Sequence, residues 1–196
     1  IGLGSTAVDS ITTGDNNVGL GDNALTAVTS GDSNTAIGKD SLKTVTTSSD
    51  NTAIGRSSLN NNTGSSNTAV GRKALETNTT ASNNTAVGYY ALLGNTTGTG
   101  NVSVGIQALQ ANTTASYNTA VGRLALNANT TGADNTALGN HAMGVNTTGS
   151  HNVAVGFAAL DANTTASYNT AVGRDALTAN TTGANNTATG YKALFA

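Results

Sequence analysis

The chain contains no cysteine and few charged or aromatic residues, and each shortage removes a class of protein from consideration. Without cysteine it has no disulfide bonds and no thiol or zinc-thiolate chemistry. Charged residues make up 9% of its 196 positions and the formal net charge is −2, which offers no electrostatic attraction for nucleic acid or for an anionic membrane. No apolar run approaches the roughly 18 residues that a membrane-spanning helix needs. Aromatic residues are 4%, and Asn, Thr, Gly and Ala fill the sequence instead, a composition typical of packed ladders and tight turns.

The chain is dominated by a repeat. One glycine recurs every 17 residues, with a single 16-residue interval between Gly55 and Gly71. These glycines are at positions 4, 21, 38, 55, 71, 88, 105, 122, 139, 156, 173 and 190. A fixed short period indicates a solenoid, in which each repeat is one coil stacked on its neighbours, and the strict period argues against disorder. We therefore expect an all-β fold, a parallel β-solenoid of about twelve 17-residue coils that forms one repeat domain over residues 1–196.

The sequence opens and closes inside repeats. Residues 1–4 (IGLG) match residues 18–21 (VGLG), and the last residue, Ala196, falls within another coil. We expect the chain to be a segment of a longer fibrous protein, so the lack of a signal peptide says little about its location.

Numbering each coil so that the recurring glycine is position five gives the pattern Asn-Thr-Ala-Val-Gly-x-x-Ala-Leu-x-x-Asn-Thr-Thr-(Gly/Ala)-x-x, as in residues 118–134. Positions one to five alternate between larger and smaller residues, which predicts a short strand. Position two is Thr, Val or Ile and position four is almost always Leu, Ile or Val, so we expect both to point into the coil. Position three is always Gly, Ala or Ser, and we expect this row of small side chains to face outward, against another copy of the chain.

The charges and the asparagines complete the coil. All eight Lys and Arg residues fall at positions six, seven and ten, and the acids fall at the same positions or in the loop before the strand, so the inferred interior carries no charge. Asn at positions one and twelve suits turns with left-handed backbone. Stacked about 4.8 Å apart, such side chains can also form hydrogen-bonded ladders along the rod. Position twelve is Ile11, Val28 and Val45 in the first coils, which predicts a more apolar interior there.

Rough magnitudes favour an oligomer. One coil buries about two sizeable apolar side chains, worth about 1.5–3 kcal/mol each. Ordering its backbone costs about 1–2 kcal/mol per residue. Ladder hydrogen bonds reduce the difference between the cost of ordering the backbone and the gain from burial, but the stability of a single thin solenoid is marginal by this estimate. Association would bury more surface per coil.

The sequence carries no pattern of catalytic or metal-binding residues. His141 and His151 lie at a corner and in a loop, with no Asp, Glu or Cys cluster at ligand spacing. No nucleophile–base pair, phosphate-binding loop or calcium-binding row of aspartates is present. We therefore expect no enzyme activity, no cofactor and no metal. The Asn-Thr-Thr triplets that begin at positions 78, 95, 112, 129, 146, 163 and 180 match the N-glycosylation acceptor, but their regular spacing favours a structural turn.

The strand units resemble a known family. Asn67-Thr68-Ala69-Val70-Gly71 and Asn34-Thr35-Ala36-Ile37-Gly38 are similar to the Asn-Ser-Val-Ala-Ile-Gly signature of the YadA-like head repeats of trimeric autotransporter adhesins. The resemblance covers essentially the whole chain, but the usual head coil is about three residues shorter, and the additional residues here fall around Asn-Thr-Thr. The longer form also looks like repeats of phage tail fibres. The resemblance implies a left-handed β-roll, homotrimerisation, and extracellular attachment to a host-surface or matrix ligand from the cell surface, in the service of virulence.

We therefore expect a non-enzymatic structural or adhesive segment of a surface fibre. The alternatives are a phage or virus tail fibre on the virion, and an ice-binding solenoid whose threonine array includes Thr79 and Thr80. Large apolar groups at exposed corners are candidate surface contacts. They are Tyr89, Tyr90, Ile106, Phe157 and Tyr191, and packing between chains is the other explanation for them. An internal copy, residues 111–123 repeated unchanged at 162–174, suggests that length itself is varied.

Overall fold

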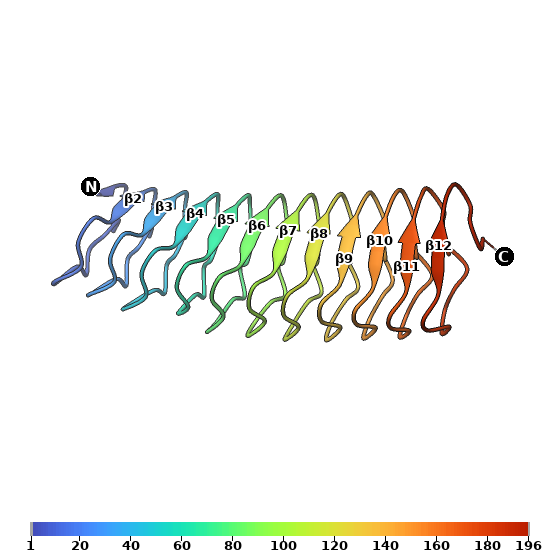
Figure 1. Cartoon of the computed structure of the whole chain (residues 1–196). Coiled ribbons are helices and arrows are strands. Elements are labelled where there is room, and N and C mark those ends of the chain that lie inside the picture. The colour runs from blue at the N-terminus through green and yellow to red at the C-terminus, as the bar shows by residue number, and fades with distance from the viewer. Residues whose placement is uncertain (1, 196) are drawn as a thin grey trace.

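The computed structural model, which describes residues 2–195, is an all-β rod built from one parallel sheet (Figure 1). The strands follow one another in sequence order across this sheet, and the two chain ends lie at opposite ends of the rod. The strands are β1 (Gly2–Leu3), β2 (Val18–Leu20), β3 (Thr35–Ile37), β4 (Thr52–Ile54), β5 (Thr68–Val70), β6 (Thr85–Val87), β7 (Val102–Val104), β8 (Thr119–Val121), β9 (Thr136–Leu138), β10 (Val153–Val155), β11 (Thr170–Val172) and β12 (Thr187–Thr189). No helix occurs in this part of the chain. The expected parallel β-solenoid is confirmed.

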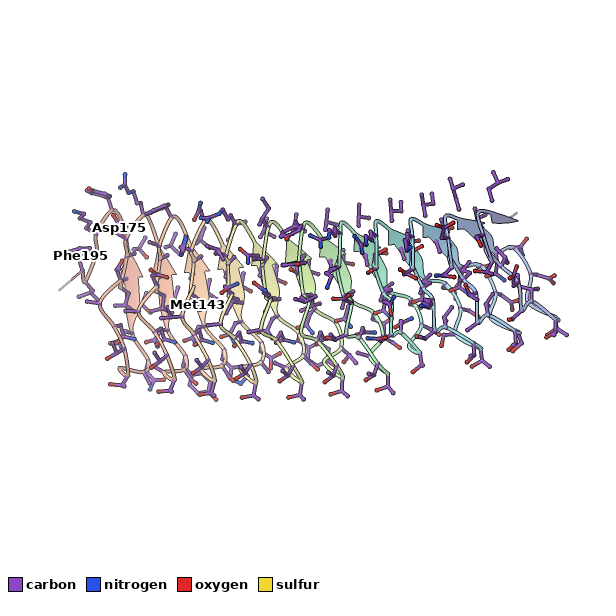
Figure 2. The ribbon with its side chains drawn as sticks, turned by 180° about the vertical axis from the view of Figure 1, so that it is seen from behind. Met143, Asp175 and Phe195 are labelled. Atoms are coloured by element: carbon purple, nitrogen blue, oxygen red, sulfur yellow. The ribbon has the colours of Figure 1, made fainter. Side chains whose placement is uncertain are left out.

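The register between strands follows the sequence period. Thr119 pairs with Thr136, Ala120 with Ala137 and Val121 with Leu138, each 17 residues apart. At the 16-residue interval the pairing is kept, with Ala53 opposite Ala69. Equivalent residues therefore form columns along the rod, as the rows of side chains in Figure 2 show.

The inward and outward faces of the strands are the reverse of the sequence prediction. The middle residue of each strand from β2 to β12 is buried, whereas the residues on either side of it are exposed or partly exposed. Position three therefore points into the coil, and positions two and four point out. The physical reason is the closeness of the opposite wall. A Cβ added to Gly19 would lie 2.6 Å from Cγ2 of Val8 and 3.1 Å from the carbonyl oxygen of Ala24. Only a small side chain fits there.

The core consists of aligned columns of small and medium-sized side chains. Position nine supplies the largest of them, and Leu75, Leu92 and Leu109 are fully buried in one line. Met143 continues this column inside the rod, whereas Asp175 and Phe195 lie on its outside (Figure 2). No charged residue is buried among residues 3–195, which confirms the predicted partition of charge.

Two asparagine ladders run through the interior. At position one, the backbone N–H of Asn118 donates to Oδ1 of Asn101 at 3.0 Å, and the N–H of Asn135 donates to Oδ1 of Asn118 at 3.0 Å. At position twelve, Nδ2 of Asn129 donates to Oδ1 of the preceding asparagine in its column at 3.0 Å. Both ladders are tied to the same wall, because Nδ2 of Asn118 and Nδ2 of Asn129 each donate to the carbonyl of Gly132 at 2.9 Å. The predicted ladders are confirmed, and every buried side-chain nitrogen and oxygen of the described residues has a partner.

The first coils and the short coil differ as the sequence indicates. Val28 and Val45 are fully buried at position twelve, and the second ladder begins only at Asn62. Nδ2 of Asn62 donates to the carbonyl two residues later, whereas Nδ2 of Asn78 donates to the carbonyl three residues later. The residue missing from the 16-residue coil is therefore the second threonine of the Asn-Thr-Thr turn.

The turns use left-handed backbone at positions other than those expected. Positive φ angles occur at positions seven, nine and seventeen, for example at Leu124 (58°), Leu126 (49°) and Tyr117 (60°), and not at the ladder asparagines. The predicted left-handed asparagines at positions one and twelve were therefore wrong. The glycine at position five is required by its geometry. Gly122 has a φ of 136°, and a Cβ there would lie 2.5 Å from the carbonyl oxygen of Gly139.

Candidate interaction surfaces

The outward side of the sheet is a long face, which we call the strand face, in which an apolar row at position four runs beside a row made mostly of threonine at position two. It consists of positions two and four. Position two is Thr or Val, and position four is Val, Ile or Leu in nearly every coil. Its most exposed members include Leu138 (47%) and Leu20 (43%). A continuous row of exposed apolar residues is uncommon on monomeric proteins, which makes this face a candidate interaction surface. Sequence reasoning missed this face, because the alternation in a three-residue strand does not reveal whether the middle residue or the two outer residues point inward.

The strand face is bordered by two edges that carry different residues. The carboxyl edge is position six, directly after the recurring glycine, and all its charged members after Asp22 are basic: Lys39, Arg56, Arg72, Arg123 and Arg174. The amino edge is positions sixteen and seventeen, which precede the asparagine of position one and the strand. Its acidic residues are Asp15, Asp32, Asp50 and Asp134. The edges therefore differ in charge sign along the same face.

The first group of predicted contacts, Tyr89 on the carboxyl edge and Tyr90 directly after it, forms an aromatic and cationic cluster. The rings of Tyr89 and Tyr90 stack with their centroids 4.0 Å apart. Nη1 of Arg72 donates to the hydroxyl oxygen of Tyr89 at 3.2 Å, and its guanidinium lies 5.6 and 5.8 Å from the two ring centroids. The side-chain hydrogen bond between the two phenols raises the pKa of Tyr89 and lowers the pKa of Tyr90. Stacked tyrosines beside an arginine are typical of energetically important contacts at interfaces.

The other predicted contacts lie farther along the same edge and do not join this cluster. Ile106 is next to it, one coil along, and is 48% exposed. Phe157 and Tyr191 lie several coils away and are exposed as well. The guanidinium of Arg174 lies 5.4 Å from the centroid of Phe157, and Nζ of Lys192 lies 5.5 Å from the centroid of Tyr191. Phe157 and Tyr191 thus each have a cation beside the ring.

Sequence reasoning missed the aromatic residues of the amino edge. Tyr117 and Tyr168 are among the most exposed side chains, at 65% and 59%. The ring of Tyr168 stacks on that of His151, with centroids 4.9 Å apart. Nδ1 of His151 lies 4.0 Å from Oδ2 of Asp134. The available signal was that large rings stand at position seventeen, where most coils have small or polar residues.

The threonines of the Asn-Thr-Thr turns form two columns with different roles. The hydroxyl of the first threonine donates along the rod, as from Oγ1 of Thr79 to the carbonyl oxygen of Thr96 at 2.9 Å. The second threonine, such as Thr80, is exposed and has no hydrogen-bonding partner. The asparagine before them is fully buried from Asn78 to Asn163, so the folded chain does not present these amides to a glycosylating enzyme.

The side chains do not form a metal site or a membrane segment in the part of the chain that is described. No group of three His, Cys, Asp or Glu residues within residues 2–195 could hold a metal ion. No helix of these residues is long and apolar enough to cross a bilayer.

Comparison of the chain with protein-family models, with curated proteins and with solved structures finds no match.

Proposed function

We propose that this chain is a non-enzymatic segment of an extracellular surface fibre, a left-handed, homotrimeric β-roll that displays contact residues for attachment. The observation that carries the proposal is the strand face, an apolar row that runs along the whole rod beside exposed columns of variable residues. A cell surface and a virion are both compatible with this role, because the same rod can be joined to either anchor.

The size of the strand face supports association. Eleven levels from β2 to β12, at about 4.8 Å each, make a face about 50 Å long. Three residues of strand are about 10 Å wide, so the strands alone offer about 500 Å². A stable interface needs about 800 Å² from each partner. Including the two edges doubles the width and brings the area to about 1,000 Å².

The assembly is tested by measuring the mass of the purified chain in solution. We expect about three times the chain mass of 19.2 kDa at micromolar concentration. Val121→Asp and Leu138→Asp, which place a charge on the strand face, should give folded monomers. Thr80→Asp, on the far turn, is the matched control and should leave the mass unchanged. A wild-type chain that is folded and monomeric at this concentration would refute the proposed assembly.

Attachment is tested separately with beads coated with the protein. We expect retention on surfaces that carry extracellular matrix or host cells. Tyr89→Ser with Ile106→Ser tests whether these edge residues contact the attachment surface or a neighbouring copy. Reduced retention with an unchanged mass supports attachment, whereas a reduced mass places the two residues between copies. Equal retention of coated and uncoated beads on every surface would contradict an adhesive role and leave a structural one.

The exposed second threonines favour a second candidate, ice binding. Thr80 and its equivalents form a regular row of free hydroxyls about 4.8 Å apart. Ice binding would produce thermal hysteresis that decreases when several of these threonines are replaced by lysine. A solution with no thermal hysteresis would exclude this candidate.

A further inference from the structure

The carboxyl edge of the strand face carries three cations on consecutive coils at one place along the rod. Lys39, Arg56 and Arg72 follow strands β3, β4 and β5 at the same position of the repeat, and all three side chains are exposed. We call these three residues the cationic row. Neighbouring coils are about 4.8 Å apart, so the row is about 10 Å long. On this edge Asp22 precedes the row and Tyr89 follows it.

The acids closest to the row along the chain have lysines of their own. Positions six to ten of these three coils contain only two acids, Asp40 and Glu76. The carboxylate of Asp40 lies 3.4 Å from Nζ of Lys43, and that of Glu76 lies 3.1 Å from Nζ of Lys73. Lys39 attracts Asp40 less strongly than Lys43 does. Five basic residues occupy the same positions, which leaves a surplus of three positive charges in a chain whose formal net charge is −2.

Two of the three side chains in the row form no ion pair within residues 2–195. The side chain of Arg56 has no hydrogen bond, ion pair or ring contact there, and Lys39 has no ion pair. Asp22, one coil before Lys39, instead accepts a hydrogen bond from the backbone N–H of Ser5 at 3.2 Å. Like charges on neighbouring strands repel one another. A ligand with several negative charges in a line would remove this repulsion.

Tyr89 continues the row on the next coil and adds an aromatic surface to it. Its side chain is 40% exposed, and its ring stacks on that of Tyr90. The hydrogen bond from Nη1 of Arg72 to its hydroxyl oxygen holds the ring beside the last cation of the row. A flat ring next to cations suits a ligand that has an apolar face as well as negative charges.

A densely sulfated linear polysaccharide has this combination of properties. Its sugars follow one another at a distance close to the spacing of the coils. Sulfate oxygens accept charge-assisted hydrogen bonds from arginine and lysine, as phosphate oxygens do. The C–H groups on one face of a sugar ring can pack against a tyrosine ring.

Other polyanions match the row less well. Consecutive sugars of an extended chain point to opposite sides, so a chain with one carboxylate per sugar offers an anion to the row only at every second coil. In an extended acidic peptide the side chains on one side are about 6.6 Å apart, which is wider than the spacing of the coils. Dense sulfation supplies an anion at each coil.

We infer that the cationic row and Tyr89 form a binding site for a densely sulfated polysaccharide, which lies along the rod from β3 to β6. The inference rests on the proposed attachment and names the class of ligand that it recognises. The three cations bind sulfates, and the ring of Tyr89 packs against a sugar at the end of the row. Binding therefore weakens as the salt concentration rises.

Surface plasmon resonance on immobilised heparin, over a series of salt concentrations, tests the row. Arg56→Gln removes the middle cation without removing a contact within the chain. We expect the affinity to fall about threefold to fivefold, and the slope of log affinity against log salt to decrease by up to about one.

Arg123→Gln is the matched control. It makes the same change of charge at the same position of another coil, where the neighbours on the edge are Ile106 and Asn140 and no second cation is adjacent. We expect its affinity for heparin to equal that of the wild type. Equal losses in Arg56→Gln and Arg123→Gln would overturn the inference, because heparin would then respond only to the net charge.

Tyr89→Leu tests the ring separately from the charges. It keeps an apolar side chain at the corner and removes the flat ring, so we expect a severalfold loss of affinity with an unchanged salt slope. Tyr191→Leu, at the same position near the end of the rod, is the control and should bind as the wild type does. An unchanged affinity of Tyr89→Leu would refute the role of this ring.

Soluble competitors identify the class of polyanion. We expect heparin to displace the chain at the lowest concentration of charge. Polygalacturonate, polyglutamate and oligothymidylate should each require about tenfold more. Equal competition by any of these three would overturn the assignment to a sulfated polysaccharide.

The outcomes also separate this inference from the proposed function. The mass of each variant in solution is measured beside its affinity, and a lower mass of Arg56→Gln would place the row between copies and refute the inference. Retention of coated beads on host cells without binding to heparin would also refute it and leave attachment standing. Heparin binding by a chain whose beads are retained on no surface would support the ligand and contradict attachment.

Discussion

Replacing Asn118 with alanine tests the position-one ladder where its loss leaves a backbone group without a partner. Oδ1 of Asn118 accepts the backbone N–H of Asn135, and its Nδ2 donates to the carbonyl oxygen of Gly132. After the substitution the buried N–H of Asn135 has no acceptor, which costs about 1–3 kcal/mol. The lost bond to Gly132 adds about 1 kcal/mol. We expect Asn118→Ala to lower the stability of this part of the rod by about 2–4 kcal/mol.

The matched control is Asn129→Ala, in the position-twelve ladder. Oδ1 of Asn129 accepts only a side-chain group, Nδ2 of Asn146, and the backbone N–H of Asn146 donates to the carbonyl of Met143 at 3.2 Å. The control removes a similar number of side-chain hydrogen bonds but leaves this amide bonded. Both variants should be destabilised, and only Asn118→Ala should expose a backbone amide.

Hydrogen exchange resolved by residue is the deciding assay, because a repeat protein does not unfold as a single two-state unit. We expect the amide of Asn135 to lose most of its protection in Asn118→Ala and the amide of Asn146 to keep its protection in Asn129→Ala. Urea denaturation followed by circular dichroism gives the accompanying loss of stability. Equal protection of the Asn135 amide in the wild type and in Asn118→Ala would refute the reasoning.

Three further outcomes follow from the geometry of the coil. Gly122→Ala should lower the melting temperature strongly, because the new methyl group meets the carbonyl of Gly139 at 2.5 Å and the backbone has a φ of 136°. Leu124→Asn should raise the urea midpoint by the equivalent of up to about 1 kcal/mol, since a partly exposed leucine is replaced at a φ of 58°, where Asn23 stands in an earlier coil. The pKa of Asp40 lies below the usual value of 3.8 for an aspartate, chiefly because Nδ2 of Asn23 donates to its carboxylate. This contribution to stability is therefore present above pH 3.8 and disappears as the pH falls through the lower pKa of the folded state. In a plot of melting temperature against pH, Asp40→Asn should therefore reduce the slope below pH 3.8. An unchanged slope in that variant would contradict the assignment.

The period alone predicted much of the fold, because stacking requires equivalent residues to lie above one another. The buried line of Leu75, Leu92 and Leu109, the asparagine ladders and the absence of interior charge all follow from that single requirement. The more apolar interior of the first coils, with Val28 and Val45 in place of asparagine, could also be predicted, since the position-twelve column can hold either valine or asparagine.

The facing of the strand could not be predicted in the same way. Either position three or positions two and four could have pointed inward. The larger residues at positions two and four favoured the second arrangement on hydrophobicity alone. Burial is decided instead by space. Oγ of Ser103 at position three donates to the carbonyl of Ala108 on the opposite wall at 2.8 Å, which shows how little room separates the two sides. The width of a coil is a property of its turns, and sequence periodicity does not report it.

Those turns depend on conformations that residue preferences argue against. Leu109 and Leu126 have φ angles of 49°, a region that leucine rarely adopts. Full burial of each side chain outweighs the cost of about 1–2 kcal/mol. The surface contacts were only partly foreseen for a related reason. Tyr89 and Phe157 could be placed on corners from their position in the repeat, whereas the exposed ring of Tyr117 became recognisable only beside the strand face.

Each strand contacts only the strand before it and the strand after it. A substitution at one level therefore has no direct route to a level two coils away. Outward residues can be exchanged singly, in any order, while the inward columns continue to hold the coil. A molecule built in this way can acquire a new recognition surface through small independent changes, without repacking a shared core.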